Sequence, residues 1–256
     1  MSSAFLMTTR NFCKRARLGA SLAVGALVLC PLVSRIIMQV QGLRLEHLEQ
    51  NVFDYYFAYL GVSYIFFIGV CLQALTGSEK FCLGLPVSST SIATWMMLSM
   101  VGLVVALQLV TNGLYRVLFF DDRWLADYWP LLGPLLFMVT LILVGHAVYW
   151  SLHAPSLTKC IFWSAVVVAL FWWFISRYFP NGYNEEIVPW RTVTLGDFIL
   201  MQLVCIAAWY QGTRAFAHVR NGTALSSPQW EQLQLWCNGL LTGSVPEQPI
   251  VPLSRK

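Results

Sequence analysis

Apolar residues of this chain gather in six long runs that short polar segments separate. The runs cover residues 18–40, 53–75, 92–115, 129–150, 157–176 and 195–215. A helix of about 20 apolar residues crosses the roughly 30 Å of hydrocarbon in a bilayer, and each run reaches that length. The pattern therefore predicts an all-α, polytopic membrane protein whose six transmembrane helices form one domain over residues 18–215.

The composition agrees with a chain that has lipid rather than water as its main solvent. Of its 256 residues, 57% are hydrophobic and 11% are charged, and the mean hydropathy is +0.63. A soluble domain carries roughly 25% charged residues, so this chain could not cover a water-facing surface. The net charge of +4 is modest, and the basic residues form no patch with interleaved aromatics. We therefore expect membrane lipid as a partner and no nucleic acid.

The first apolar run follows a basic segment, as in a signal peptide. Arg10, Lys14, Arg15 and Arg17 precede it. However, the run is longer than the roughly 7–15 apolar residues of a signal peptide, and no A-x-A-like cleavage site closes it. We interpret it as a retained span, and residues 1–17 as a basic N-terminus in the cytoplasm.

The positions of Lys and Arg predict the orientation of the spans, because cytoplasmic loops carry an excess of both. With the N-terminus inside, ten of the 16 Lys and Arg residues fall on the cytoplasmic side and six on the other. The count favours both termini in the cytoplasm, including a tail over residues 216–256. The expected location is the cell (cytoplasmic) membrane, crossed several times.

Charged and titratable side chains inside hydrocarbon are costly and often functional. Arg35 is the deepest, and either extends to the headgroups or contacts a substrate. Asp54 and Asp197 lie at span ends, where they are solvated or cap helices. His146 either packs through a hydrogen bond or, together with His153, ligates a metal or haem. No matching pair of histidines on another run supports such ligation.

Polar residues inside the apolar runs have two interpretations. The candidates for a substrate pathway are Gln108, Thr111, Asn112 and Gln202. The same side chains are suited to hydrogen bonds between packed helices, which is a common role of polar groups in membranes. Their positions in the sequence do not decide between a pathway and packing.

Sequence motifs of enzymes and metal sites are absent. H-E-x-x-H, G-x-S-x-G and the phosphate-binding G-x-x-x-x-G-K-[ST] do not occur. The seven cysteines include no C-x-x-C pair. We therefore predict a chain that is not an enzyme and that binds no cofactor and no metal. If ATP drives it, ATP and Mg bind a partner subunit.

The most distinctive polar segment lies between the second and third runs. Its candidate functional residues are Leu85, Pro86, Val87, Ser88, Ser89 and Thr90. Proline presets a turn, and the serines and threonine are suited to cap the helix that follows. These features suit a coupling element, and equally any short loop that enters a span.

The stretch Leu85-Pro86-Val87-Ser88 resembles a loop of ABC-2 type transporter permeases, in which a short helix after the second span leads into the third. Three further stretches are similar to a bacterial branch of that family, the multi-span ABC-2-like proteins of planctomycetes. These stretches cover residues 111–115, 129–137 and 214–222. The resemblance extends over all six runs.

This resemblance implies a permease subunit of the bacterial inner membrane that acts as an exporter. It also implies that the subunit pairs with a second permease half, either a copy of itself or a similar chain. It also implies separate ABC ATPase subunits, and residues 85–90 would transmit their movement into the spans. The alternative is a membrane scaffold or assembly protein, which the lack of a strongly polar path favours. An intramembrane enzyme comes third, because no pair of nucleophile and base is recognisable.

Overall fold

The computed structural model describes residues 2–40, 52–119, 130–178 and 193–222, with single positions at 228, 230, 232, 235 and 236. Side chains are described for residues 5–29, 32–33, 36–37, 40, 59–78, 80–114, 130–176 and 193–222, and at those single positions. The predictions for the side chains of Arg35 and Asp54, and for most of the tail, lie outside this part of the chain.

The described residues form six α-helices and no strand. The helices are α1 (Ser2–Val40), α3 (Val52–Leu83), α4 (Ser89–Phe119), α6 (Leu132–Ser151), α7 (Leu157–Tyr178) and α8 (Leu195–Arg220). In all of them except α1, the described residues include a stretch that is long and apolar enough to cross a membrane, which gives five such helices. The prediction of an all-α, multi-pass architecture is confirmed to that extent.

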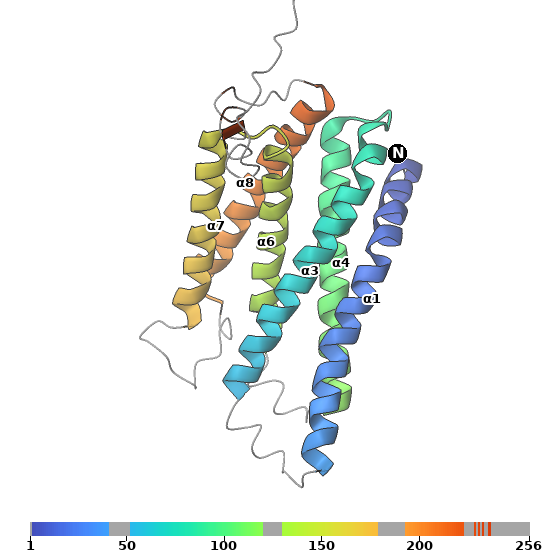
Figure 1. Ribbon diagram of the computed structural model, residues 1–256, viewed down its shortest axis with the longest axis vertical. Coiled ribbons are helices and arrows are strands. Elements are labelled where there is room, and N and C mark those ends of the chain that lie inside the picture. The colour runs from blue at the N-terminus through green and yellow to red at the C-terminus, as the bar shows by residue number, and fades with distance from the viewer. Residues whose placement is uncertain are drawn as a thin grey trace, which may run out of the picture.

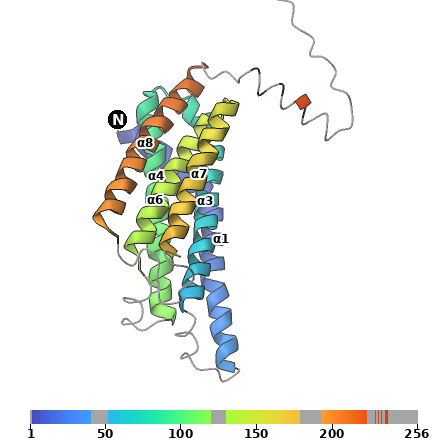
Figure 2. The same cartoon turned by 90° about the vertical axis from the view of Figure 1, so that its left-hand side faces the viewer.

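Successive helices run in opposite directions along the bundle (Figures 1 and 2). The start of α1, the α3–α4 loop, the α6–α7 loop and the end of α8 lie together at one end, the upper end in Figure 1. Since the six helices alternate, the last one returns to the end at which the first begins.

Helix α1 begins at Ser2 and includes the whole basic segment predicted for residues 1–17. Thr8, Phe12 and Ala16 are buried, and their spacing of four places them on one face of the helix. Packing of that face on the bundle explains why the helix continues beyond the apolar run, since most helical stability in proteins comes from tertiary contacts.

Helix α6 begins at Leu132, slightly after the predicted start of the run at position 129. Pro130 lies just before it, and Pro134 lies in its first turn, where a missing N–H costs no helical hydrogen bond. The carbonyl of Pro134 accepts a 3.0 Å hydrogen bond from the Tyr64 hydroxyl of α3. The start of α6 is therefore attached to α3.

Helix α8 begins with a capping box. The backbone N–H of Asp197 donates to Thr194 Oγ1 at 3.1 Å, and the N–H of Thr194 donates to the Asp197 carboxylate at 3.4 Å. A carboxylate in a first turn also interacts favourably with the helix dipole. The interpretation of Asp197 as a capping residue is confirmed.

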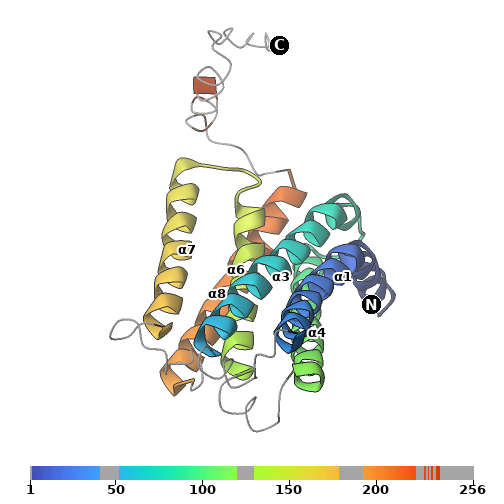
Figure 3. The same cartoon turned by 60° about the horizontal axis from the view of Figure 1, so that its bottom comes forward.

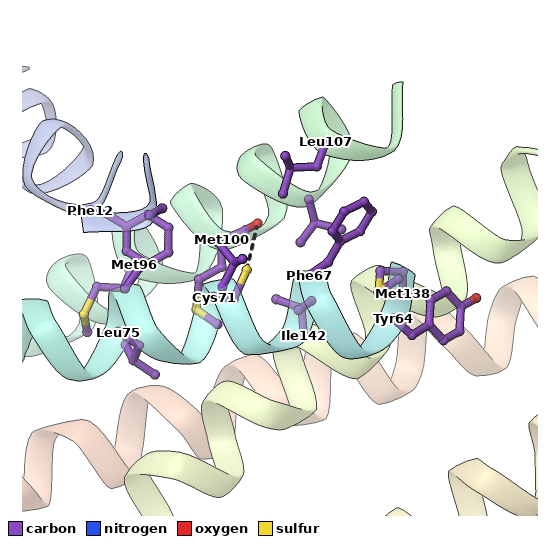
Figure 4. Packing of buried hydrophobic residues seen from close by; sticks show 14 of the residues in the cluster. Phe12, Tyr64, Phe67, Cys71, Leu75, Met96, Met100, Leu107, Met138 and Ile142 are labelled. Carbon is purple, nitrogen blue, oxygen red and sulfur yellow. Dashed lines mark hydrogen bonds between the residues drawn. The ribbon is translucent and has the colours of Figure 1, made fainter. Parts of the chain in front are cut away.

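The main core lies where α1, α3, α4 and α6 face one another (Figure 4). Phe67, Cys71 and Leu75 of α3 are completely buried there, as are Met138 of α6 and, almost completely, Met100 of α4. The Cys71 thiol donates a 3.9 Å hydrogen bond to the Met100 carbonyl. In lipid such a core holds its helices together through close packing, because lipid tails are as apolar as the core itself.

Glycine allows α8 to approach its neighbours closely. A Cβ atom at Gly212 would lie 2.6 Å from Met97 Cε and 2.9 Å from His146 Nδ1. On the other side of the bundle, a Cβ at Gly77 of α3 would lie 2.9 Å from Cδ of Arg15. A larger side chain at either position would push its neighbours out of place.

Helix α7 lies at the edge of the bundle (Figure 3). Only 11% of its membrane-length stretch is buried, against 50% for α4 and α6. On its inner side Phe174 stacks on Phe137 with ring centroids 5.3 Å apart, and Trp163 and Leu170 are buried. The exposed outer side, which includes Trp172, is suited to contact lipid.

Candidate functional site at the loop between α3 and α4

The α3–α4 loop, residues 84–88, and the first turn of α4 present side chains alternately to the bundle and to the outside. The half-buried side chains are those of Leu85, Val87 and Ser89. The exposed side chains are those of Pro86, Ser88 and Thr90. Two of the half-buried residues, Leu85 and Val87, pack on the main core. The predicted residues are therefore together, and they divide into an inner and an outer set.

Ser88 caps the start of α4. Its Oγ accepts a 3.3 Å hydrogen bond from the backbone N–H of Ser91 and donates a 2.7 Å hydrogen bond to Ser91 Oγ. A tight turn around Pro86 precedes the cap, with the N–H of Val87 donating to the carbonyl of Leu85 at 2.9 Å. The capping predicted for this segment therefore belongs to Ser88.

Arg220, the last residue of α8, holds the loop against the bundle. Its guanidinium donates hydrogen bonds to the main-chain carbonyls of Leu85 and Val87. A third hydrogen bond, 3.3 Å long, goes to Ser89 Oγ. A charged donor makes such bonds stronger than those between neutral groups. The end of α8 is thereby connected to a loop that lies 131 to 135 residues earlier in the chain.

The last turn of α8 is itself fixed in place. Phe216, one turn before Arg220, is completely buried, and its ring meets that of Trp150 edge to face at 4.8 Å. Gly222 has a φ of 66°, a left-handed conformation that commonly ends helices, and its N–H donates to the carbonyl of Val219 at 3.2 Å. Aromatic packing and a glycine stop thus position the Arg220 guanidinium.

Cys82 lies buried directly before the loop. Burial raises the pKa of its thiol to about 11, although a hydrogen bond with Ser78 and the charge of Arg15 act in the opposite direction. A thiol with this pKa stays protonated at neutral pH, and it is the thiolate that reacts as a nucleophile. Cys82 is therefore a packing residue beneath the loop.

A second polar group, the Tyr59 cluster, consists of Tyr59 of α3 with Thr111 and Asn112 of α4. Asn112 Nδ2 donates to the Tyr59 hydroxyl at 3.1 Å, and that hydroxyl lies 3.1 Å from Thr111 Oγ1. Thr111 Oγ1 also lies within hydrogen-bond distance of two carbonyls of its own helix, that of Leu107 at 2.9 Å and that of Gln108 at 3.2 Å. Either hydroxyl can donate in the contact between Tyr59 and Thr111, and the cluster binds α3 to α4.

The predicted pathway residues are only partly brought together. Thr111 and Asn112 meet in the Tyr59 cluster, and Asn112 Nδ2 also donates to the Gln108 carbonyl at 2.6 Å. The Gln108 side chain is buried, and its Oε1 has no hydrogen-bond partner among the described residues. Gln202 lies elsewhere, exposed on α8. Within one chain, the structure does not join all four residues into a path.

His146 is completely buried in α6. Its Nε2 accepts a 3.1 Å hydrogen bond from Trp150 Nε1, so the packing hydrogen bond predicted for it is present. His153 is exposed, and its ring centroid lies 5.2 Å from that of Trp150. Among the described residues, no group of three or more His, Cys, Asp or Glu side chains is placed to hold a metal ion.

Basic side chains gather at the end of the bundle that holds the loop, which we call the basic end. The Lys and Arg residues with described side chains are Arg10, Lys14, Arg15, Arg17, Lys80, Lys159, Arg214 and Arg220. They belong to the first half of α1, the ends of α3 and α8 and the start of α7, which lie on this side of the bundle (Figure 1). Asp197, whose carboxylate is the one acidic side chain that the structure describes, lies at the opposite end of the bundle.

Sequence reasoning did not single out Arg220 or Tyr59. In the sequence, Arg220 is one of the ten Lys and Arg residues expected on the cytoplasmic side and part of the stretch 214–222, and Tyr59 is part of an apolar run. A weak signal existed for Arg220, since a cation in a last helical turn before Asn221 and Gly222 is suited to bind carbonyls. Its actual acceptors depend on the tertiary fold.

The loop, its anchor Arg220 and the surrounding cations form the most developed polar surface on an otherwise apolar bundle. Function must be argued from that geometry and from the short sequence resemblance. Comparisons with protein-family models, with curated proteins and with solved structures gave no match to this chain.

Proposed function

We propose that this chain is the transmembrane permease subunit of an ATP-driven transporter, an exporter of the ABC-2 type whose ATPase is a separate subunit. The observation that carries the proposal is the two-sided α3–α4 loop. Arg220 binds its inner side, while Pro86 and Thr90 are exposed on its outer side. A coupling element needs an exposed side that a partner can contact and an inner side that is bonded to the bundle. The partner's movement is then transmitted to the helices through a continuous network of contacts.

Movement of this loop would reach three helices. The Ser88 cap joins the loop to α4, and Arg220 joins it to α8. Helix α8 in turn packs on α6 at Gly212, where the two backbones approach closely. Alternating access in transporters is largely rigid-body movement of helix groups, and these contacts would make α4, α6 and α8 move together.

In this proposal α1 is the sixth span, and the basic end faces the cytoplasm with both chain termini. The excess of Lys and Arg supports that orientation. It would bring the outer side of the loop to the cytoplasmic ATPase, which binds ATP and Mg. The membrane would be the bacterial inner membrane.

The proposed pathway forms between two permease halves. Within one chain, Thr111 and Asn112 are occupied by Tyr59. Gln202, however, is exposed on α8, a helix of which only 22% is buried in its membrane-length stretch. A second half covering this face would bring Gln202 to the interface between the two halves.

A membrane scaffold is the second candidate function, and the Tyr59 cluster favours it. Its hydroxyl and amide groups bind one another and the backbone, which is what packing between helices requires. A scaffold of this kind would use the exposed faces of α7 and α8 to bind partners without moving a substrate.

The test is a pull-down of the tagged, detergent-solubilised protein from its native membrane, followed by an ATPase assay. We expect wild type to recover a nucleotide-binding subunit and Thr90→Glu to lose it, because the new charge lies on the outer side of the loop. The matched control is Thr158→Glu. Thr158 is exposed at the same end, two residues after Ser156, as Thr90 lies two residues after Ser88.

Both glutamates enter the first turn of a helix, where a negative charge is tolerated or favourable. Folding should therefore be equal in the two variants, as measured by elution from a sizing column. Recovery of no ATPase by wild type would favour the scaffold, and equal loss from both variants would remove the loop from the proposed contact.

A further inference from the structure

Three cations of α1 lie on the face that is turned away from the bundle. Arg10, Lys14 and Arg17 are exposed, and their spacing of four and three residues places them on one side of the helix. Phe12 and Ala16, which are buried, occupy the other side. We call Arg10, Lys14 and Arg17 the cationic stripe.

Contacts of α1 with its neighbours give the depth of the stripe along the bundle. Arg15 lies against Gly77 of α3, just after the apolar run of that helix ends at Leu75. The stripe therefore lies beside the level at which α3 changes from apolar to polar residues. In a membrane helix that change marks the region of the lipid headgroups.

Exposed leucines follow the stripe along α1, since Leu18 and Leu22 come after Lys14 at successive spacings of four residues. Leu18 is 68% exposed and Leu22 is 62% exposed, although both belong to the apolar part of the helix. A surface with cations at headgroup depth and bare leucines next to them complements a molecule with an anionic head and an apolar tail. A free anion would use only the first of these two parts.

We propose that the cationic stripe binds the headgroups of anionic phospholipids, whose acyl chains lie along Leu18 and Leu22. Charge complementarity selects this occupant. A second copy of the chain offers the stripe no described acidic surface, because the described carboxylate of Asp197 is at the opposite end and bound to Thr194. The inference does not depend on the transporter proposal, since it concerns this chain and lipid alone.

The test measures binding of fluorescent phosphatidylglycerol and phosphatidylcholine to the full chain, purified in a neutral maltoside detergent. Wild type should bind phosphatidylglycerol at least about tenfold more tightly than phosphatidylcholine. Each cation near anionic lipid contributes roughly a fivefold change in affinity, so the double variant Arg10→Gln/Lys14→Gln should lose most of this preference. The charge-preserving variant Arg10→Lys/Lys14→Arg should keep it.

A control double variant that loses the same charge elsewhere distinguishes the effect of the stripe from that of the total positive charge at the basic end. Lys80→Gln/Arg214→Gln also removes two exposed cations, and it should keep the preference for phosphatidylglycerol. Equal loss in both double variants, or no preference in wild type, would overturn the proposal. Displacement of bound phosphatidylglycerol by inorganic phosphate at about 10 mM would also overturn it, because exposed cations alone should hold free phosphate only weakly.

A measurement on the wild-type chain tests the same proposal without relying on variants that could fail to fold. Cys13 lies between Arg10 and Lys14 and is exposed. Bound lipid should cover it, so a maleimide should modify Cys13 more slowly in nanodiscs of phosphatidylglycerol than in nanodiscs of phosphatidylcholine. Mass spectrometry of the peptide that carries Cys13 gives the rate. Equal rates in the two lipids would contradict a lipid at the stripe.

Discussion

The α3–α4 loop and the Tyr59 cluster are both polar features of an apolar bundle, but they use their polar atoms differently. In the cluster, the Tyr59 hydroxyl accepts from Asn112 and shares a hydrogen bond with Thr111, so that these hydrogen bonds join two helices. In the loop, Arg220 occupies carbonyls on the inner side, and Thr90 on the outer side is exposed. The first arrangement holds helices together, whereas the second leaves a surface for a partner.

The largest expected effect comes from removing the inner contact of the loop. Arg220→Met should lower the free energy of unfolding by about 2 kcal/mol, because a hydrogen bond to a charged group contributes roughly 1.5–3 kcal/mol and the released acceptors, which are only half-buried, regain bonds to water. Denaturation in mixed micelles, followed by tryptophan fluorescence, measures the change. The control is Arg214→Met, since Arg214 is exposed and, among the residues that the structure describes, its guanidinium has one hydrogen bond, to the Tyr210 hydroxyl at 3.5 Å. Similar losses in both variants would show that Arg220 is an ordinary surface cation.

The next largest expected loss of stability tests whether the Tyr59 cluster serves to hold helices together. Thr111→Val keeps the shape of the side chain but removes the hydroxyl that is hydrogen-bonded to Tyr59, which should cost about 1 kcal/mol. Thr213→Val is the matched control, because within the described part of the chain the Thr213 hydroxyl bonds the Tyr210 carbonyl of its own helix alone, at 2.9 Å. The difference between the two variants in free energy of unfolding gives the contribution of the hydrogen bond between α3 and α4. If transport activity falls while stability does not, the cluster belongs to a pathway.

A pair of capping serines separates stability from function at the loop. Ser88→Ala and Ser156→Ala each remove a hydroxyl that accepts from a backbone N–H at 3.3 Å, from Ser91 and Lys159 respectively. Each should cost roughly 1 kcal/mol of stability. Recovery of the ATPase should fall for Ser88→Ala alone, since only that cap belongs to the proposed contact. A parallel fall for Ser156→Ala would mean that general destabilisation is responsible.

The smallest effect concerns the chemistry beneath the loop. A raised pKa means that the thiolate of Cys82 forms only as the pH approaches about 11. From pH 7 to pH 9, maleimide should therefore modify exposed Cys13 and leave Cys82 unmodified, and Arg220→Met should not change this if the loop remains folded. Peptide mapping by mass spectrometry separates the two sites. Early modification of Cys82 would indicate that the loop opens.

Sequence patterns predicted the helices well and their contacts poorly. Apolar runs gave the positions of the six helices that the structure describes, and five of these contain a stretch long and apolar enough to cross the hydrocarbon of a bilayer. The start of α1 at Ser2 was not predictable, since it depends on Phe12 packing against neighbours that are distant in sequence. The position of Gln202 depends on how α8 is rotated, which close packing at Gly212 determines.

The loop illustrates the same limit. Pro86 and the serines that follow it indicated a turn and a cap, because both are local features. The partner of that turn, Arg220, lies 131 to 135 residues away and could not be read from any local pattern. Local chemistry therefore predicted the shape of the site, and only the fold revealed what holds it.

Arg220 lies in the final turn of α8, and the final turn of a helix frays more readily than any other part. When that turn unwinds, the loop loses all of its Arg220 hydrogen bonds at once, so loop order and helix length form a single equilibrium. The packing of Phe216 on Trp150 and the helix stop at Gly222 hold that turn, so the contacts that stabilise the end of α8 also keep the loop in place.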